Sequence, residues 1–239
     1  MMKIIKSNQR HFADHGWLAT NWHFSFSDYY DPQNMNWSAL RVFNDDTVQP
    51  GQGFPRHPHK DMEIITYVLD GAVEHGDNLG NNGIINAGEL QVMSAGRGIV
   101  HSEFNASKTN PVHFLQLWIL PRNQGGQPRW AQRRWDSNAN DIVAAGASPG
   151  LHLIVSDGSI PGTLPIDQDA TIYIAKLTPG QTVSHHSNPN RHAYLFVIDG
   201  DVKINGAAIS KGDQARIADE QNLQIGSVTD AHLMLIDLP

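Results

Sequence analysis

The chain has 239 residues, and its 24 acidic side chains against 17 lysines and arginines give a formal net charge of −7. It contains 13 histidines and no cysteine, which excludes disulfide scaffolds, thiolate zinc sites, iron–sulfur clusters and cysteine nucleophiles. The acidic balance argues against binding to nucleic acid or anionic membranes, and the hydrophobic content of 40% is typical of a folded protein.

Short apolar or alternating runs recur along the chain and predict β-strands. They are rich in Val, Ile, Tyr and Phe and are bounded by Gly, Asn, Asp and Pro. No long amphipathic helix pattern is present, so we expect an antiparallel sandwich or barrel. In chain order the runs are 22–26, 38–43, 62–69, 112–120, 170–177, 192–198 and 231–237.

The first residues carry no targeting signal that we recognise. Met1 to Phe12 has no apolar core of signal-peptide length, and no run of about 18 apolar residues occurs anywhere. We therefore expect a cytoplasmic protein without a membrane span.

The segment 50–71 recurs at 179–200, at a constant offset of 129 residues. The shared landmarks are Pro50-Gly51, His57 and Asp70-Gly71, with their counterparts Pro179-Gly180, His186 and Asp199-Gly200. This repeat predicts two related β domains. We place the N-terminal domain at 1–122 and the C-terminal domain at 149–239, joined by a polar, turn-rich connector at 123–148.

Two motifs in the first half carry residues that bind metals. His57 and His59 are two positions apart, and so are His101 and Glu103. On extended backbone such pairs point to the same side. If the two segments lie side by side, three imidazoles and one carboxylate meet at one point, a set that suits iron, nickel, manganese, copper or zinc.

Other residues near these motifs have simpler interpretations. Glu63 could be a fifth ligand, a supporting group or a packing residue. His75 and His113 lie in alternating strands and are interpreted as ordinary half-buried or surface histidines. The tryptophans are interpreted as packing residues, and Arg129, Arg133 and Arg134 as part of a solvated connector.

The second half does not repeat the metal-binding set. At the offset of 129, His57 corresponds to His186, whereas His59 corresponds to Asn188. A loop shorter by five residues places Ile225 and Ser227 at the positions of His101 and Glu103. We therefore expect one metal ion, in the first domain.

The blocks PGQGFPRHPHKDMEIITYVLDG (50–71) and GELQVMSAGRGIVHSEFN (88–105) resemble the cupins and, within them, the pirin family. The resemblance implies an all-β bicupin fold, with two tandem antiparallel jelly-roll β-barrels and a metal in the N-terminal barrel alone. It implies His57, His59, His101 and Glu103 as ligands. In many cupins the residue at the position of Glu63 ligates, whereas in pirins the second motif supplies the carboxylate.

The resemblance also implies an activity, the oxygen-dependent ring opening of the flavonol quercetin. The ion would act as a Lewis acid, and Glu103 would take the proton of the substrate hydroxyl. Iron is the expected ion, with nickel, copper, manganese and zinc as alternatives. The expected partners are a flavonol-like aromatic substrate and O2.

An alternative function belongs to a different class. Animal pirins are linked to transcriptional co-regulation, so the chain could be a metal-responsive regulatory protein that binds a protein partner. Another small-molecule cupin reaction is a third possibility, because fold alone does not define function. We expect a monomer, since two barrels in one chain reproduce what single-barrel cupins achieve by dimerising.

Overall fold

Strands make up nearly all of the regular structure in the computed structural model, which describes residues 1–135, 142 and 146–239. The one helical turn among these residues is the 3-10 turn η1 (Ser7–Gln9), and none of their helices could cross a membrane. The strands are β1 (Met2–Ile5), β2 (His11–Asp14), β3 (Leu18–Trp22), β4 (Leu40–Val48), β5 (Gly53–His59), β6 (Glu63–Asp70), β7 (Ala72–Asp77), β8 (Asn82–Asn86), β9 (Glu89–Ser94), β10 (Ile99–Asn105), β11 (Val112–Ile119), β12 (Arg129–Arg134), β13 (His152–Ser156), β14 (Leu164–Pro165), β15 (Thr171–Leu177), β16 (Thr182–His186), β17 (His192–Asp199), β18 (Asp201–Ile204), β19 (Ala207–Ser210), β20 (Gln214–Ala218), β21 (Asn222–Ser227) and β22 (Ala231–Leu238).

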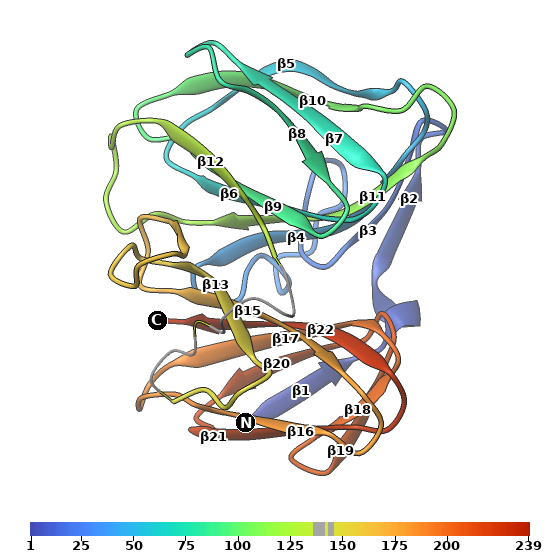
Figure 1. The fold of residues 1–239 in the computed structure, drawn as a ribbon, viewed down its shortest axis with the longest axis vertical. Helices are drawn as coiled ribbons and strands as arrows, with labels where there is room; N and C mark the ends of the chain where they lie inside the picture. Colours follow the sequence, from blue (N-terminus) through green and yellow to red (C-terminus); the bar gives the residue numbers. More distant parts are fainter. Residues whose placement is uncertain (136–141, 143–145) are drawn as a thin grey trace. The chain divides into compact units, whose positions relative to one another are not determined.

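The chain divides into two units, each with its own core (Figure 1). The N-terminal unit comprises His11–Trp135 with Ile166–Gln168, and the C-terminal unit comprises Met1–Arg10, Asp136–Pro165 and Asp169–Pro239. The first residues belong to the C-terminal unit because β1 pairs with β20 there.

The domain limits expected from the sequence stay a prediction, and residues 136–141 and 143–145 of the expected connector lie outside the described residues. Within that connector, β12 pairs antiparallel with β9. Composition alone favours a solvated loop there, but Trp130 lies partly buried in this strand.

The N-terminal unit is built from two antiparallel sheets that form two layers (Figure 1). The larger sheet has seven strands in the order β12-β9-β6-β11-β4-β3-β2, and the smaller has four in the order β5-β10-β7-β8. Side chains from both sheets, among them Val68 and Phe114 from the larger and Val73 and Ile85 from the smaller, form a shared apolar cluster. Alternation along the strands places these side chains on the inner faces.

The C-terminal unit repeats this plan. Its sheets have the orders β1-β20-β17-β22-β15-β13-β14 and β16-β21-β18-β19, and its buried core includes Leu195, Val202, Ile225 and Leu233. The pairing is antiparallel except between β13 and β14. The predicted all-β fold with two tandem antiparallel jelly-roll barrels is confirmed.

Most predicted strands lie where the apolar runs indicate, and the run 22–26 is an exception. β3 ends at Trp22, and the chain then turns away. The Ser25 hydroxyl donates to the carbonyl of Asp31 and accepts from its amide, and Ser27 has a φ of 51°. A serine that bonds local backbone in this way competes with strand pairing.

A buried polar cluster lies inside the C-terminal unit, around Asp237. Its carboxylate lies 2.5 Å from Nε2 of His185 and accepts hydrogen bonds from Ser187 Oγ at 2.6 Å and from Nε of Arg191. Burial alone would raise the pKa of Asp237, but the hydrogen bonds from these donors lower it overall. The cluster joins β16 to β22 and keeps the carboxylate charged.

We predict that Asp237→Asn lowers the free energy of unfolding by about 3 kcal/mol, because it leaves Arg191 without its buried counter-charge. Urea titration followed by circular dichroism measures this change. The matched control is Asp230→Asn, whose side chain is exposed and whose effect should stay within about 0.5 kcal/mol. Equal effects of the two substitutions would contradict a stabilising role for the cluster.

Candidate metal centre

The two histidine motifs lie on neighbouring strands of the smaller sheet in the N-terminal unit. β10 pairs with β5 so that His101 is opposite His57 and Ile99 is opposite His59. β5 is an edge strand, and this position tolerates Pro58, which has no amide hydrogen to donate. The pairing brings both motifs to one place, as the spacing predicts.

His57, His59 and His101 form a group that we call the outer triad. One ring nitrogen of each lies within 4.8 Å of the other two. His101 is buried, with 1% of its surface exposed, whereas His57 and His59 are half-buried. Nδ1 of His57 lies 2.7 Å from the carbonyl oxygen of Pro55, and a proton on this nitrogen leaves Nε2 free as a ligand.

Burial keeps the imidazoles of His59 and His101 uncharged at neutral pH. It lowers the pKa of His59 to about 4 and that of His101 to about 3, and neighbouring histidines add to both effects. A neutral imidazole presents a lone pair, which is the form that binds metals. Both ring nitrogens of His101 are buried and have no hydrogen-bond partner within residues 1–135, 142 and 146–239, so the outer triad fits a divalent transition metal ion.

Glu103 occupies a deeper position than this group. Only 3% of its surface is exposed, and its carboxylate accepts hydrogen bonds from Gln116 Nε2 at 2.6 Å, Thr66 Oγ1 at 3.2 Å and Nε2 of Gln91. It gathers with His101 and His75 rather than with His57 and His59. The predicted set of four ligands therefore does not form one group within 4.8 Å, and its carboxylate stays a prediction.

His75 is a candidate functional residue that the sequence analysis treated as ordinary. It is 1% exposed, and neither ring nitrogen makes a hydrogen bond in the part of the chain that the structure describes; Oδ2 of Asp77, 3.5 Å from Nε2, is at ion-pair distance. One ligand atom from each of His75, His101 and Glu103 lies within 4.8 Å of the others, and we call this group the inner triad. The available signal was the spacing of His75 and Asp77, which alternation puts on one side of β7.

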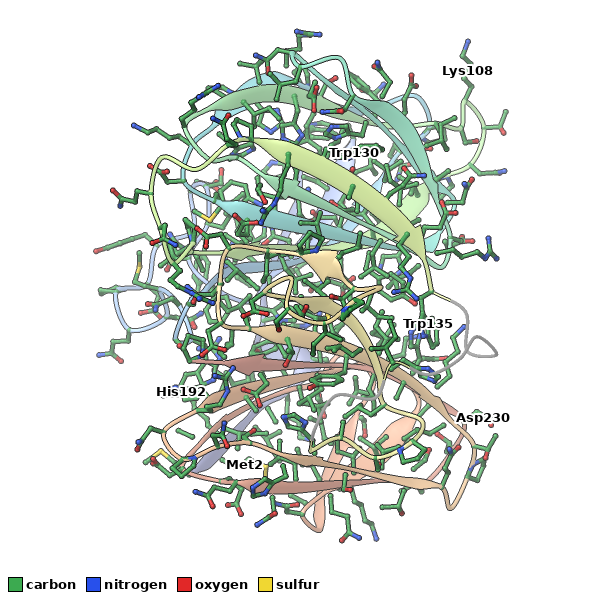
Figure 2. The ribbon with its side chains drawn as sticks, turned by 60° about the vertical axis from the view of Figure 1, so that its left-hand side comes forward. Met2, Lys108, Trp130, Trp135, His192 and Asp230 are labelled. Carbon is green, nitrogen blue, oxygen red and sulfur yellow. The ribbon has the colours of Figure 1, made fainter. Side chains whose placement is uncertain are left out.

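Trp130 and Trp118 pack against these histidines. The Trp130 ring, labelled in Figure 2, stacks on His75 with 5.2 Å between centroids and 13° between planes. Its Nε1 donates to Oε1 of Gln91 at 2.7 Å. The Trp118 ring meets His59 edge-on at 4.9 Å. The two indoles restrict the orientation of both imidazoles.

Glu63 lies outside both triads. Its carboxylate accepts a hydrogen bond from Ser94 Oγ at 2.5 Å, and Nε of Arg129 donates to the same hydroxyl at 2.9 Å. Burial raises the pKa of Glu63. These contacts connect β6, β9 and β12 and favour a supporting role. His113 also lies outside the triads, with Nε2 2.6 Å from Oδ1 of Asp45.

A pocket of about 400 Å³ opens beside His59. The exposed cationic side chains of Lys60 and Arg97 line it, together with Ile99, and no acidic residue does. Gly96, next to this rim, has a φ of 47°, and an added Cβ would lie 2.1 Å from the carbonyl oxygen of Gly126. This rim therefore requires glycine at position 96, and its charge suits an anionic ligand.

Strand register identifies the corresponding positions in the C-terminal unit. β7 and β18 follow the equivalent Gly71 and Gly200, and their pairing with β10 and β21 matches Glu103 with Ile225. The pairing of β10 with β5 and of β21 with β16 then matches His101 with Leu223 and His57 with His185. The alignment by sequence offset, with His186, Ile225 and Ser227 at these positions, is wrong. β5 contains a bulge between the residues that face His101 and Glu103, and the turn between β9 and β10 is longer than its counterpart between β20 and β21.

The interior of the C-terminal unit therefore has apolar side chains where β10 carries ligands. Leu223 and Ile225 are 1% and 0% exposed, and neither has a donor atom for a metal. His185 keeps an inward position, but its Nε2 faces Asp237. Among the described residues of this unit, no three ligand-type side chains gather closely enough to hold an ion.

Comparison with known families agrees with this division of the chain. The family model described as Pirin matches residues 5–119, and that described as Quercetinase C-terminal cupin domain matches residues 153–238. The chain is 45% identical to a quercetin 2,3-dioxygenase of Escherichia coli strain K12, covering 100% of this chain and 99% of the relative. It is also 45% identical to a pirin-like protein of Caulobacter vibrioides, over 94% of each chain.

Solved structures give the same result. The crystal structure of YhhW from Escherichia coli matches this chain with a TM-score of 0.91 and 44% sequence identity. The match covers 100% of this chain and 98% of the YhhW chain. A structure of bacterial pirin YhhW in complex with nickel(II) has the same TM-score and identity, and covers 100% and 99% of the two chains. On this sequence identity over the full length, the chain belongs to the pirin family.

Proposed function

We propose that this protein is a metal-dependent dioxygenase of the quercetin 2,3-dioxygenase type, which opens a flavonol ring with O2. The observation that carries the proposal is the outer triad of buried or half-buried imidazoles beside an open pocket. The 45% identity to a relative named quercetin 2,3-dioxygenase supports the choice of substrate.

We assign His57, His59, His101 and Glu103 as the ligands of one divalent transition metal ion. The outer triad contributes three nitrogens, and Glu103 is two residues from His101 on the same strand. Iron is the expected ion, with nickel, copper, manganese and zinc as alternatives, because nitrogen and oxygen donors accept most first-row metals. The nickel complex of a relative supports a divalent ion. Element analysis of protein purified without added metal identifies it.

A bound divalent ion supplies Lewis acidity that favours the ionised form of a substrate hydroxyl. The side chains of the chain perform the other tasks. Glu103 accepts the hydroxyl proton on a carboxylate oxygen, and Gln91 and Gln116 hold that carboxylate in place. Lys60 and Arg97 attract the resulting anion to the pocket, while Pro58, an exposed residue of its lining, offers apolar surface to a flat aromatic ring.

The first test of this function is turnover. Protein loaded anaerobically with iron, nickel or copper is mixed with quercetin and then exposed to oxygen. We expect loss of flavonol absorbance and release of carbon monoxide, and His101→Ala should lower both rates at least about 100-fold because a buried ligand is removed. The control His186→Gln changes an exposed histidine of the C-terminal unit and should keep full activity.

No carbon monoxide with any of these metals would refute the dioxygenase. The regulatory alternative would then be tested by capture of a protein partner with wild type and His101→Ala. Metal-dependent capture without turnover would favour regulation. The monomeric state and the cytoplasmic location stay predictions.

The proposed role of Glu103 gives a second test. Glu103→Gln keeps the shape of the side chain but cannot accept the substrate proton. We expect kcat to fall about 100-fold or more, with metal content measured on the same sample. A variant that holds its metal and retains full kcat would exclude Glu103 as the base.

The lowered histidine pKa values predict how the metal-free protein responds to acid. Unfolded chains bind protons at His59 and His101 below their ordinary pKa of 6.5, whereas the folded protein binds them only near pH 4 and pH 3. Stability should therefore fall as the pH is lowered from 6.5 towards 4. Urea unfolding of wild type and His101→Gln at pH 7.5 and pH 5 measures this, and the variant should lose less. An equal loss of stability in both proteins would show that the pKa of His101 is not lowered in the folded protein.

A further inference from the structure

We propose that the inner triad of His75, His101 and Glu103 is a second metal-binding position, which shares His101 with the outer triad. This position goes beyond the proposed function, because neither the assigned ligands nor the proposed reaction uses His75. Its donors are two imidazoles and one carboxylate, the combination that binds non-haem iron(II) in many oxygenases.

The first argument is that the His75 imidazole is buried and makes no hydrogen bond to the described residues. It is 1% exposed, and neither ring nitrogen has a hydrogen-bond partner among the described residues. The same holds for both nitrogens of His101. Buried polar atoms without partners cost about 1–3 kcal/mol each, so such positions are normally satisfied by a water molecule or an ion. Two adjacent unpartnered imidazoles point to a cation, which accepts a lone pair from each.

The second argument is the set of groups that hold the triad. Nε2 of His75 lies 3.5 Å from Oδ2 of Asp77, and a carboxylate on that side favours a proton on Nε2, which leaves Nδ1 as the ligand atom. Asp77 is itself fixed, because Asn81 Nδ2 donates to Oδ2 at 2.7 Å and the amide of Leu79 donates to Oδ1 at 2.9 Å. Carboxylates behind ligating histidines are typical of metal sites.

The third argument is strand register. On the pair β7 and β10, His75 lies opposite Glu103 and Asp77 lies opposite His101. Residues two apart share a face, so all four side chains point to the interior, where each is at most 5% exposed. Trp130 stacks on His75 and limits rotation of its ring. The position is therefore built from ordered strands and not from loops.

The two triads differ in access. His57 and His59 are half-buried, and His59 lines the pocket, whereas all three members of the inner triad are buried. An ion in the inner position would keep His101 and Glu103 as ligands but would lack His57 and His59, the two half-buried ligands of the outer triad.

Removing the outer triad tests this proposal. The double variant His57→Ala/His59→Ala keeps the inner triad, and the triple variant with His75→Gln added removes both. Each is titrated with cobalt(II), followed by visible absorption and by element analysis after gel filtration. We expect the double variant to bind one ion per chain and the triple variant to bind at least about 100-fold more weakly. The matched control adds His15→Gln, an exposed histidine of the same unit, to the double variant and should bind like it.

The proposal would be overturned if the double variant binds cobalt(II) no more tightly than the triple variant does. Circular dichroism shows whether each variant folds. If the triple variant is unfolded, the 15N resonances of the His75 ring in the double variant give the answer during zinc titration. A shift of one ring nitrogen supports ligation, and unchanged resonances refute it. Neither measurement depends on turnover, so failure of the dioxygenase proposal would leave this result intact.

Discussion

His101 lies uncharged in the interior of the N-terminal unit, and both candidate ligand groups depend on it. It is on β10, between β5 on one side and β7 on the other. The ring centroid of His57 is 4.5 Å away on the first side, and that of His75 is 5.4 Å away on the second. Burial lowers its pKa to about 3, so it remains a base with a free lone pair at any physiological pH.

The C-terminal unit shows what the same arrangement of strands becomes without this residue. Leu223 takes the position of His101 and packs into the apolar core. His185 remains inward, but Asp237 on β22 provides its partner. The contact between His185 on β16 and Asp237 on β22 therefore joins the two sheets of this unit, whereas the candidate ligands of the other unit, on β5, β7 and β10, all lie in one sheet. The difference between the units is in a few inward side chains, because their sheets have the same plan.

The sequence was sufficient for the parts of the site that depend on local spacing. His57 with His59, and His101 with Glu103, follow from alternation on a strand, and the apolar runs indicate most of the strands. His75 was missed because one histidine in an alternating strand has no motif around it, and its relation to Glu103 arises from pairing of β7 with β10. The offset of 129 misplaced the counterpart of His57 because a bulge in β5 changes the register, and the counterparts of His101 and Glu103 were misplaced because the turn between β9 and β10 is longer than that between β20 and β21. Such an insertion leaves no mark in composition.

The hydrogen bonds around Glu103 explain why the interior favours a cation over an anion or an empty state. The side-chain donors nearby, Gln91, Gln116 and Thr66, are all directed at this carboxylate. An anion entering the same space would meet the negative charge of Glu103. Among the described residues, the ring nitrogens of His75 and His101 have no hydrogen-bond partner, and each neutral imidazole offers one lone pair. This interior therefore lacks a positively charged group that accepts lone pairs. A divalent metal ion supplies both the charge and the acceptor, whereas a water molecule supplies no charge.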